Sequence, residues 1–162
     1  DRLEIDPLLV RTKFPCHDGP DVEIVTLELA LFIEYVVGSS AELQDLFARV
    51  EMTLGPPTPQ RPWTLLLAFD EYIPGNQFRP DSGRKCMVCS FYVKELGPGL
   101  LPVNELWFSP MQVLSQKMKR IVGGFPRLLH WLVHRVENGP VNIKENKGQV
   151  SPFPLNIQPS KK

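Results

Sequence analysis

The feature that most constrains the fold is an apolar run that ends in two carboxylates. Residues 65–69 read Leu-Leu-Leu-Ala-Phe, and Asp70 and Glu71 follow directly. A short apolar run without alternation is typical of a strand that is covered on both faces. The sequence therefore predicts a central strand that carries an acidic side chain at its carboxyl end.

A second apolar run is expected to pair with the first. Residues 86–93 read Cys-Met-Val-Cys-Ser-Phe-Tyr-Val, a composition rich in β-branched and aromatic residues. Between the runs, residues 74–76 (Pro-Gly-Asn) and 80–83 (Pro-Asp-Ser-Gly) are turn sequences. We therefore expect an antiparallel hairpin with a long loop.

Composition limits the class of protein. The chain has 162 residues, of which 43% are hydrophobic and 22% charged, which fits one globular domain with a single core. No apolar run approaches the roughly 20 residues that a membrane-spanning helix needs. Three cysteines are too few for a disulfide scaffold. We expect an intracellular protein without a membrane partner, with the nucleus as one candidate compartment.

The N-terminal third is predicted to be helical. Residues 23–37 are apolar with good helix formers and end at a glycine. Residues 39–42 (Ser-Ser-Ala-Glu) read as a capping box for a second helix, which would run to about Met52. The proline-rich residues 55–59 cannot continue that helix, so residues 1–54 are predicted to form a helical subdomain.

The part after the proline cluster is predicted to hold the sheet. Residues 105–108 could be a third strand, with Ser109 as the N-cap and Pro110 as the first residue of a helix through Ile121. After two glycines, a last helix is expected from about Pro126. The sequence thus predicts an α+β fold with a small, mostly antiparallel sheet of about three strands in residues 60–137, and a poorly ordered tail in residues 138–162.

A net charge of zero conceals an uneven distribution of charge. Residues 1–53 carry eleven acids and four bases, whereas residues 106–136 carry five bases and no acid. The basic segment could face phosphates, or it could lie against the acidic N-terminal part. Phosphate contacts from the loop beside Asp70 and from the basic helix are predicted for Asn76, Arg84, Lys85, Lys117, Lys119 and Arg120.

Two residue pairs have the spacing of metal ligands. Cys86 and Cys89 form a C-x-x-C, but residues three apart on a strand face opposite sides, which favours small buried side chains over a chelate. His130 and His134 lie four apart on a predicted helix and share one face, as metal-binding pairs do. The sequence between them is Trp-Leu-Val, so the glutamate of the H-E-x-x-H motif is absent, and an ordinary helix surface is the favoured interpretation.

Several motifs follow one another in an order that resembles a known group of proteins. The strand ending in Asp-Glu is followed by Ile-Pro-Gly-Asn at residues 73–76, a basic turn at residues 84–85, a Ser-Phe-Tyr strand, Trp-Phe at residues 107–108 and Gly-Gly at residues 123–124. This order resembles uncharacterised mobile-element-like proteins that are abundant in dinoflagellate genomes. More remotely, it is similar to the opening of the ribonuclease H-like catalytic domain of cut-and-paste transposases.

The second resemblance implies a role for Asp70. Those enzymes cleave and join DNA with two divalent metals, which requires carboxylates that converge from separate elements. Asp70 would be the first catalytic metal ligand, magnesium the metal, and Glu71 would point to the opposite side. In such a domain another strand ending in Asp and a later acidic helix follow, whereas this chain offers only Glu137 and Glu145.

The resemblance thus implies a partial transposase-derived domain that is inactive alone. Two alternatives stay open. In the first, Asp70 and Glu71 serve only to solvate the end of a strand. In the second, the protein as a whole is a non-enzymatic domain that binds a protein or a nucleic acid through the hairpin and the basic helix.

Overall fold

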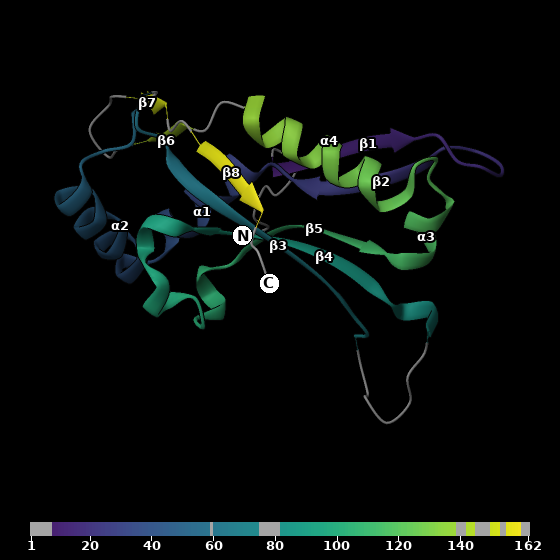
Figure 1. The fold of residues 1–162 in the computed structure, drawn as a ribbon, viewed down its shortest axis with the longest axis horizontal. Coiled ribbons are helices and arrows are strands. Elements are labelled where there is room, and N and C mark those ends of the chain that lie inside the picture. Colours follow the sequence, from purple (N-terminus) through teal and green to yellow (C-terminus); the bar gives the residue numbers. More distant parts are fainter. Residues whose placement is uncertain are drawn as a thin grey trace, which may run out of the picture.

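The fold is built around one open β-sheet (Figure 1). The computed structural model describes residues 8–58, 60–74, 82–138, 142–144, 150–152 and 155–159. Across the sheet the strand order is β1 (Leu9–Phe14), β2 (Val22–Leu27), β5 (Phe108–Leu114), β4 (Cys86–Val93), β3 (Trp63–Tyr72) and β8 (Leu155–Pro159). The protein is therefore α+β, as predicted, with a larger sheet than the expected three strands.

Pairing differs in kind along the sheet. The first five strands in the order are antiparallel to their neighbours, and β8 runs parallel to β3, with Leu65 opposite Ile157. The β2–β5 junction is short, with a single pair in register, Thr26 opposite Met111. In residues 138–162, where we expected a poorly ordered tail, the structure describes β8 and the small hairpin of β6 (Asn142–Lys144) and β7 (Val150–Pro152).

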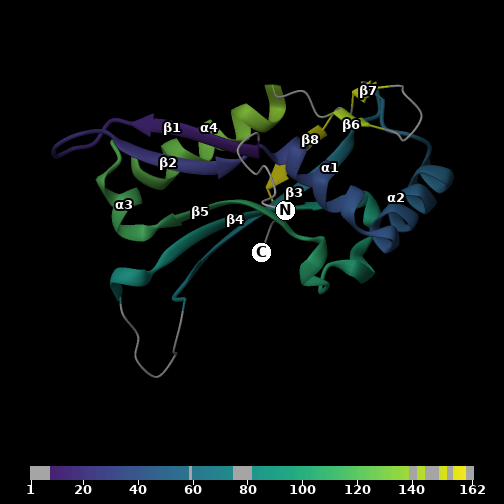
Figure 2. The ribbon, with the colours of Figure 1, turned by 180° about the vertical axis from the view of Figure 1, so that it is seen from behind.

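In the described part of the chain, four helices accompany the sheet: α1 (Leu29–Ser39), α2 (Ala41–Leu54), α3 (Ser115–Arg120) and α4 (Gly124–Asn138). Figures 1 and 2 show α4 lying along the sheet, with α3 at one end and the α1–α2 pair at the other. Short 3-10 turns occupy residues 82–84, 94–96, 98–100 and 104–106. In the described ranges, none of the helices has both the length and the apolar character that crossing a bilayer requires.

One face of the sheet, called here the covered face, forms the core with the helices. Because side chains alternate along a strand, residues such as Leu65, Phe91 and Met111 all point to this face and are almost fully buried. The inner side of α4 adds Leu128 and Leu132 to the same cluster. The covered face therefore holds most of the apolar burial that stabilises the fold.

The opposite side of the same strands, called here the open face, stays largely in contact with solvent. It carries side chains from four neighbouring strands: Val25, Tyr72, Val88, Gln112 and Leu114. Toward α2 this side is closed by residues 94–107, where the Tyr92 hydroxyl donates to the Gly97 carbonyl and the Trp107 indole to the Leu101 carbonyl. The rest of the open face has no helix of the described chain above it (Figures 1 and 2).

The predicted helix over residues 23–37 is wrong in its first part. Residues 22–27 form β2, paired with β1, and the helix begins only at Leu29. The buried and exposed residues of β2 alternate strictly, with Val22, Ile24 and Thr26 facing the core. This period of two, rather than helix propensity, fixes the segment as a strand.

The predicted helix start at Ser109 and Pro110 is also wrong. Both residues lie in β5, and the helix is the short α3 that begins at Ser115. The register between β4 and β5 shifts between Cys89 and Phe91, opposite this Ser-Pro pair. A bulge is one of the few places where a paired strand tolerates proline, because no ladder hydrogen bond is required of its nitrogen.

The hairpin of β3 and β4 is confirmed, with Asp70 opposite Val88. The expectation that its first strand is covered on both sides is only partly met, because Leu65 is buried while the alternate residue Leu66 is half-buried. The cap of α2 is confirmed one residue later than the expected hydroxyl, since the Leu43 amide donates to the hydroxyl oxygen of Ser40.

Candidate functional site

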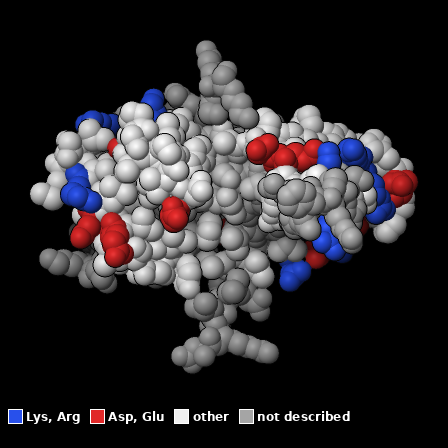
Figure 3. All heavy atoms as spheres, turned by 90° about the horizontal axis from the view of Figure 1, so that it is seen from below, with Lys and Arg blue, Asp and Glu red and all other residues white. Residues whose placement is uncertain are grey.

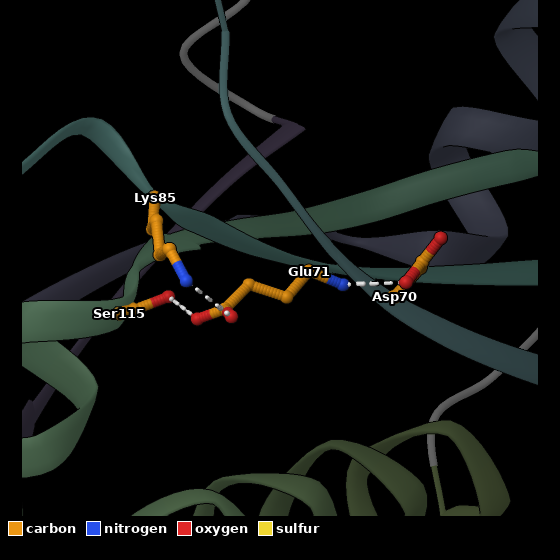
Figure 4. Close-up of polar contacts among 4 residues, drawn as sticks. All are labelled: Asp70, Glu71, Lys85 and Ser115. Carbon is orange, nitrogen blue, oxygen red and sulfur yellow. Dashed lines mark hydrogen bonds and ion pairs between the residues drawn. The ribbon is translucent and has the colours of Figure 1, made fainter. Parts of the chain in front are cut away.

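The two acids at the end of β3 fall on opposite sides of the sheet (Figure 4). Adjacent residues of a strand alternate in direction, so Asp70 lies on the open face and Glu71 on the covered side, where it reaches Ser115 at the start of α3. The expected opposite orientation of Glu71 is therefore confirmed. Of the two carboxylates in Figure 4, that of Glu71 contacts side chains outside β3.

Glu71 joins three elements through its carboxylate. The Ser115 hydroxyl donates to Oε1 at 2.6 Å, and the Lys85 ammonium lies 3.5 Å from Oε2. The Ser115 amide also donates to the Lys85 carbonyl at 2.7 Å, which ties α3 to β4. The hydrogen bond from Ser115 lowers the pKa of Glu71, and the positive charges of Lys85 and Lys119 act in the same direction.

Asp70 is exposed and forms a local contact. Its Oδ1 accepts a hydrogen bond from the backbone amide of Glu71 at 2.8 Å. Across the sheet its neighbour is Val88, an apolar residue. Within the described ranges, no three His, Cys, Asp or Glu side chains come together as a metal-binding group. Asp70 is thus placed at the strand end as a single carboxylate, and its role as a metal ligand remains a prediction.

The predicted phosphate-binding residues are not gathered at one place. Lys85 and Lys119 lie near Glu71, and Lys117 is exposed on α3. Arg120 turns away, to a carboxylate oxygen of Asp18 at 3.4 Å and to the Asp18 carbonyl at 3.2 Å.

Two of the predicted residues lie in or beside the loop between β3 and β4. Arg84 ends the 3-10 turn of residues 82–84, next to Lys85. Asn76 is outside the residues that the structure describes, so its predicted phosphate contact stays a prediction. The structure therefore brings Lys85 and Lys119 together and leaves the six-residue set untested as a whole.

The basic segment pairs in part with the acidic N-terminal residues. In addition to the Arg120–Asp18 contact, the Arg135 guanidinium forms an ion pair with Glu28, which is half-buried. One of the two alternatives for this segment, contact with the acidic part, is therefore confirmed for these two arginines. Seen from below (Figure 3), basic and acidic side chains gather at the two ends of the molecule, with few charges between them.

Ser115 is the residue of this cluster that sequence reasoning missed. It was placed inside the body of a helix, whereas it is the first residue of α3 and is only 3% exposed. Its partner Glu71 is 44 positions away. A serine in front of a basic run is the signal that the sequence offers, and it does not identify a distant partner.

The cysteine pair behaves as expected. Cys86 and Cys89 are both buried and both free thiols. Their strand places them on opposite sides of the sheet, and burial raises the pKa of Cys89 to about 12. A thiol with such a pKa stays protonated at neutral pH and is a poor metal ligand or nucleophile.

Comparison of the chain with protein-family models, curated protein sequences and solved structures finds no match. The site is therefore interpreted from its own geometry.

Proposed function

We propose that this chain is part of a ribonuclease H-like, transposase-derived domain that acts on DNA, and that Asp70 is the first ligand of a magnesium ion. The observation that carries this proposal is the parallel pairing of β8 with β3. A second strand next to the acid-bearing strand, running in the same direction, is what a convergent set of carboxylates needs.

The parallel arrangement brings two strand ends to one edge of the sheet. Strands that run the same way have their carboxyl ends side by side, and binding sites form at such edges. Leu67 is opposite Pro159, the last residue of β8, and Asp70 lies three residues beyond Leu67. An acid shortly after β8 would therefore lie beside Asp70, as two-metal chemistry requires.

The order of elements along the chain gives further support. The acid-bearing β3 is followed by its hairpin partner β4, by β5, by the helices α3 and α4, by the small β6–β7 hairpin, and then by β8. The transposase resemblance implies an order of strand, strand, strand, helix and strand, which the chain matches apart from its second helix and this hairpin. This agreement concerns the arrangement of elements, and it leaves the ligand set incomplete.

The chain itself supplies few ligands beside Asp70. Residues 160–162, which follow β8, are Ser-Lys-Lys and contain no acid. A single carboxylate binds magnesium with low affinity, because water fills the other positions around the ion. Lys85, Lys117 and Lys119 would face DNA phosphates at the end of β3, on the Glu71 side of the sheet. We therefore propose DNA contact and one metal ligand for this chain, and strand cleavage only for a protein that adds the missing acids.

A magnesium titration of ¹⁵N-labelled protein, followed by NMR, tests the proposal. We expect amide shifts centred on Asp70 that saturate in the millimolar range and disappear in Asp70→Asn. Glu71→Gln is the matched control, because it removes the adjacent carboxylate on the other side of the sheet and should leave the shifts at Asp70 in place. Shifts that are absent, or that persist in Asp70→Asn, would refute the metal-ligand role.

The second candidate function is a non-enzymatic interaction domain. Val25, Tyr72 and Leu114 are each about 40% exposed on the open face, which is unusual for large apolar side chains on one sheet surface. Titration with a short DNA duplex at low salt separates the candidates. Shifts around Lys85 and Lys119 support DNA contact on the Glu71 side of the strand end. Shifts confined to the open face, without any magnesium response, favour the interaction domain.

A further inference from the structure

Two histidines lie one turn apart on the outer side of α4. We propose that His130 and His134 together form a surface binding site for a divalent transition metal such as zinc or nickel. This site is separate from Asp70 and does not depend on the proposed function.

The two imidazoles are placed as a chelating pair. Their ring centroids are 6.3 Å apart, and the ring planes differ by 25°. Both side chains are exposed. A zinc ion bound by two imidazoles lies about 2.0–2.1 Å from each nitrogen, so rotation of the two side chains is enough to let one ion bridge them. Residues four apart on a helix share a face throughout its length, so the backbone needs no change.

The helix below the pair is held in place. Leu128, Leu132 and Val136, on the inner side of α4, are buried in the core. The Arg135–Glu28 ion pair adds a contact with the start of α1. Because the backbone of α4 is fixed by this packing, binding the ion orders side chains and leaves the helix in place.

The ligand types select the class of metal. Imidazole nitrogens suit zinc, copper and nickel, whereas magnesium prefers oxygen ligands. Within the described residues no third His, Cys, Asp or Glu completes a group with the pair, so water would fill the other positions. Exposed Arg127, one turn before His130, brings a positive charge that weakens binding. The site is therefore a two-ligand chelate of moderate affinity.

The sequence between the histidines argues for binding without hydrolysis. Trp131 stands where the zinc-protease motif has glutamate, and its ring packs edge-on against Phe14, with centroids 5.4 Å apart. No general base is supplied from that position. The bound ion would stabilise α4 by linking two residues that lie one turn apart.

Calorimetric titration of the chelator-treated full chain with zinc chloride, and separately with nickel chloride, tests this inference. We expect one ion per chain, and affinity that falls about tenfold or more in His130→Gln and in His134→Gln, because each removes one of two ligands. Circular dichroism checks that both variants stay folded, which we expect because both positions are exposed.

His17 is a matched control, because it is the one other histidine in the sequence. His17→Gln should bind as the original chain does, and so should Asp70→Asn, which separates this site from the proposed magnesium ligand. Equal affinity in all four variants would overturn the inference, as would the absence of any binding.

Discussion

The two faces of the sheet are made by the same strands and have opposite character. In β2, Val22, Ile24 and Thr26 point to the covered face and are nearly inaccessible, while the alternate residues Glu23 and Val25 are exposed on the open face. The covered face is almost entirely apolar, and the open face mixes apolar, charged and amide side chains. The comparison teaches that the buried side chains that stabilise the fold and the solvent-exposed ones occupy alternate positions of one sequence.

At the end of β3, two neighbouring residues show the same difference between the two faces. Both residues are exposed, but Glu71 is tied to Ser115 and Lys85 on the helix side, whereas Asp70, on the other side, accepts a bond from the backbone amide of Glu71. A carboxylate held by side chains of other elements contributes to the structure, and one held by its own strand is accessible to a ligand. We therefore assign the structural role to Glu71 and the candidate ligand role to Asp70.

The largest expected effect comes from removing a side chain of the covered face. Leu65→Ala should lower the free energy of unfolding by about 2–5 kcal/mol, because Leu65 is 0% exposed and its loss leaves a cavity. Urea denaturation followed by circular dichroism measures the change.

The matched variant on the open face is Leu114→Ala. Leu114 is 39% exposed, so we expect a loss below about 1 kcal/mol. If both substitutions cost the same, the two faces do not differ in the way described, and Leu114 is covered by something outside the described residues.

A smaller effect of opposite sign is expected at Thr26. This residue is 2% exposed, and its Oγ1 is buried without a hydrogen-bond partner among the residues that the structure describes. Thr26→Val removes a desolvated hydroxyl at constant shape, so the free energy of unfolding should rise by about 1 kcal/mol. Thermal and urea denaturation measure it.

Thr12→Val is the control for Thr26→Val. Thr12 lies opposite Ile24 on the neighbouring strand, on the same side of the sheet, and is only half-buried. Its hydroxyl can reach water, so we expect no gain from its removal. An equal gain in both variants would point to strand propensity rather than to an unpaired hydroxyl.

The smallest effect concerns acid stability at Glu71. Its pKa is lowered from the ordinary 4.5 in the folded state, so the carboxylate stabilises the fold above that pH, and its contribution is lost as pH falls through the lower, folded pKa. Glu71→Gln should flatten this acid limb, and so should Ser115→Ala, which removes the main cause of the shift. Melting temperatures measured between pH 3 and pH 6 test this prediction. If their slope against pH were unchanged in Glu71→Gln, the stabilising role of the Glu71 carboxylate would be contradicted.

The sequence indicated the local parts of the fold. The β3–β4 hairpin, the hydroxyl cap of α2 and the apolar stripe of α4 all depend on residues close together in the chain, and all three are present. Cues of this kind are strong because they need no knowledge of what lies across the sheet.

Distant pairings could not be predicted in this way. The helix-forming residues after Glu23 hid the alternation of β2, and Pro110 reads as a helix start unless the bulge opposite it is known. The contact of Ser115 with Glu71 depends on how β3 and α3 meet. At the candidate site the sequence thus indicated Asp70 but not the partners of Glu71.

The parallel strand β8 has a consequence for the order of folding. Its partner β3 first pairs with β4, its close neighbour in the chain, whereas the β3–β8 pairing must close a loop that includes β4, β5, α3 and α4. Closing a long loop costs entropy before any contact repays it, and such pairings form slowly. We therefore expect β8 to join last, so that the edge of β3 beside Asp70 is completed in the final step of folding.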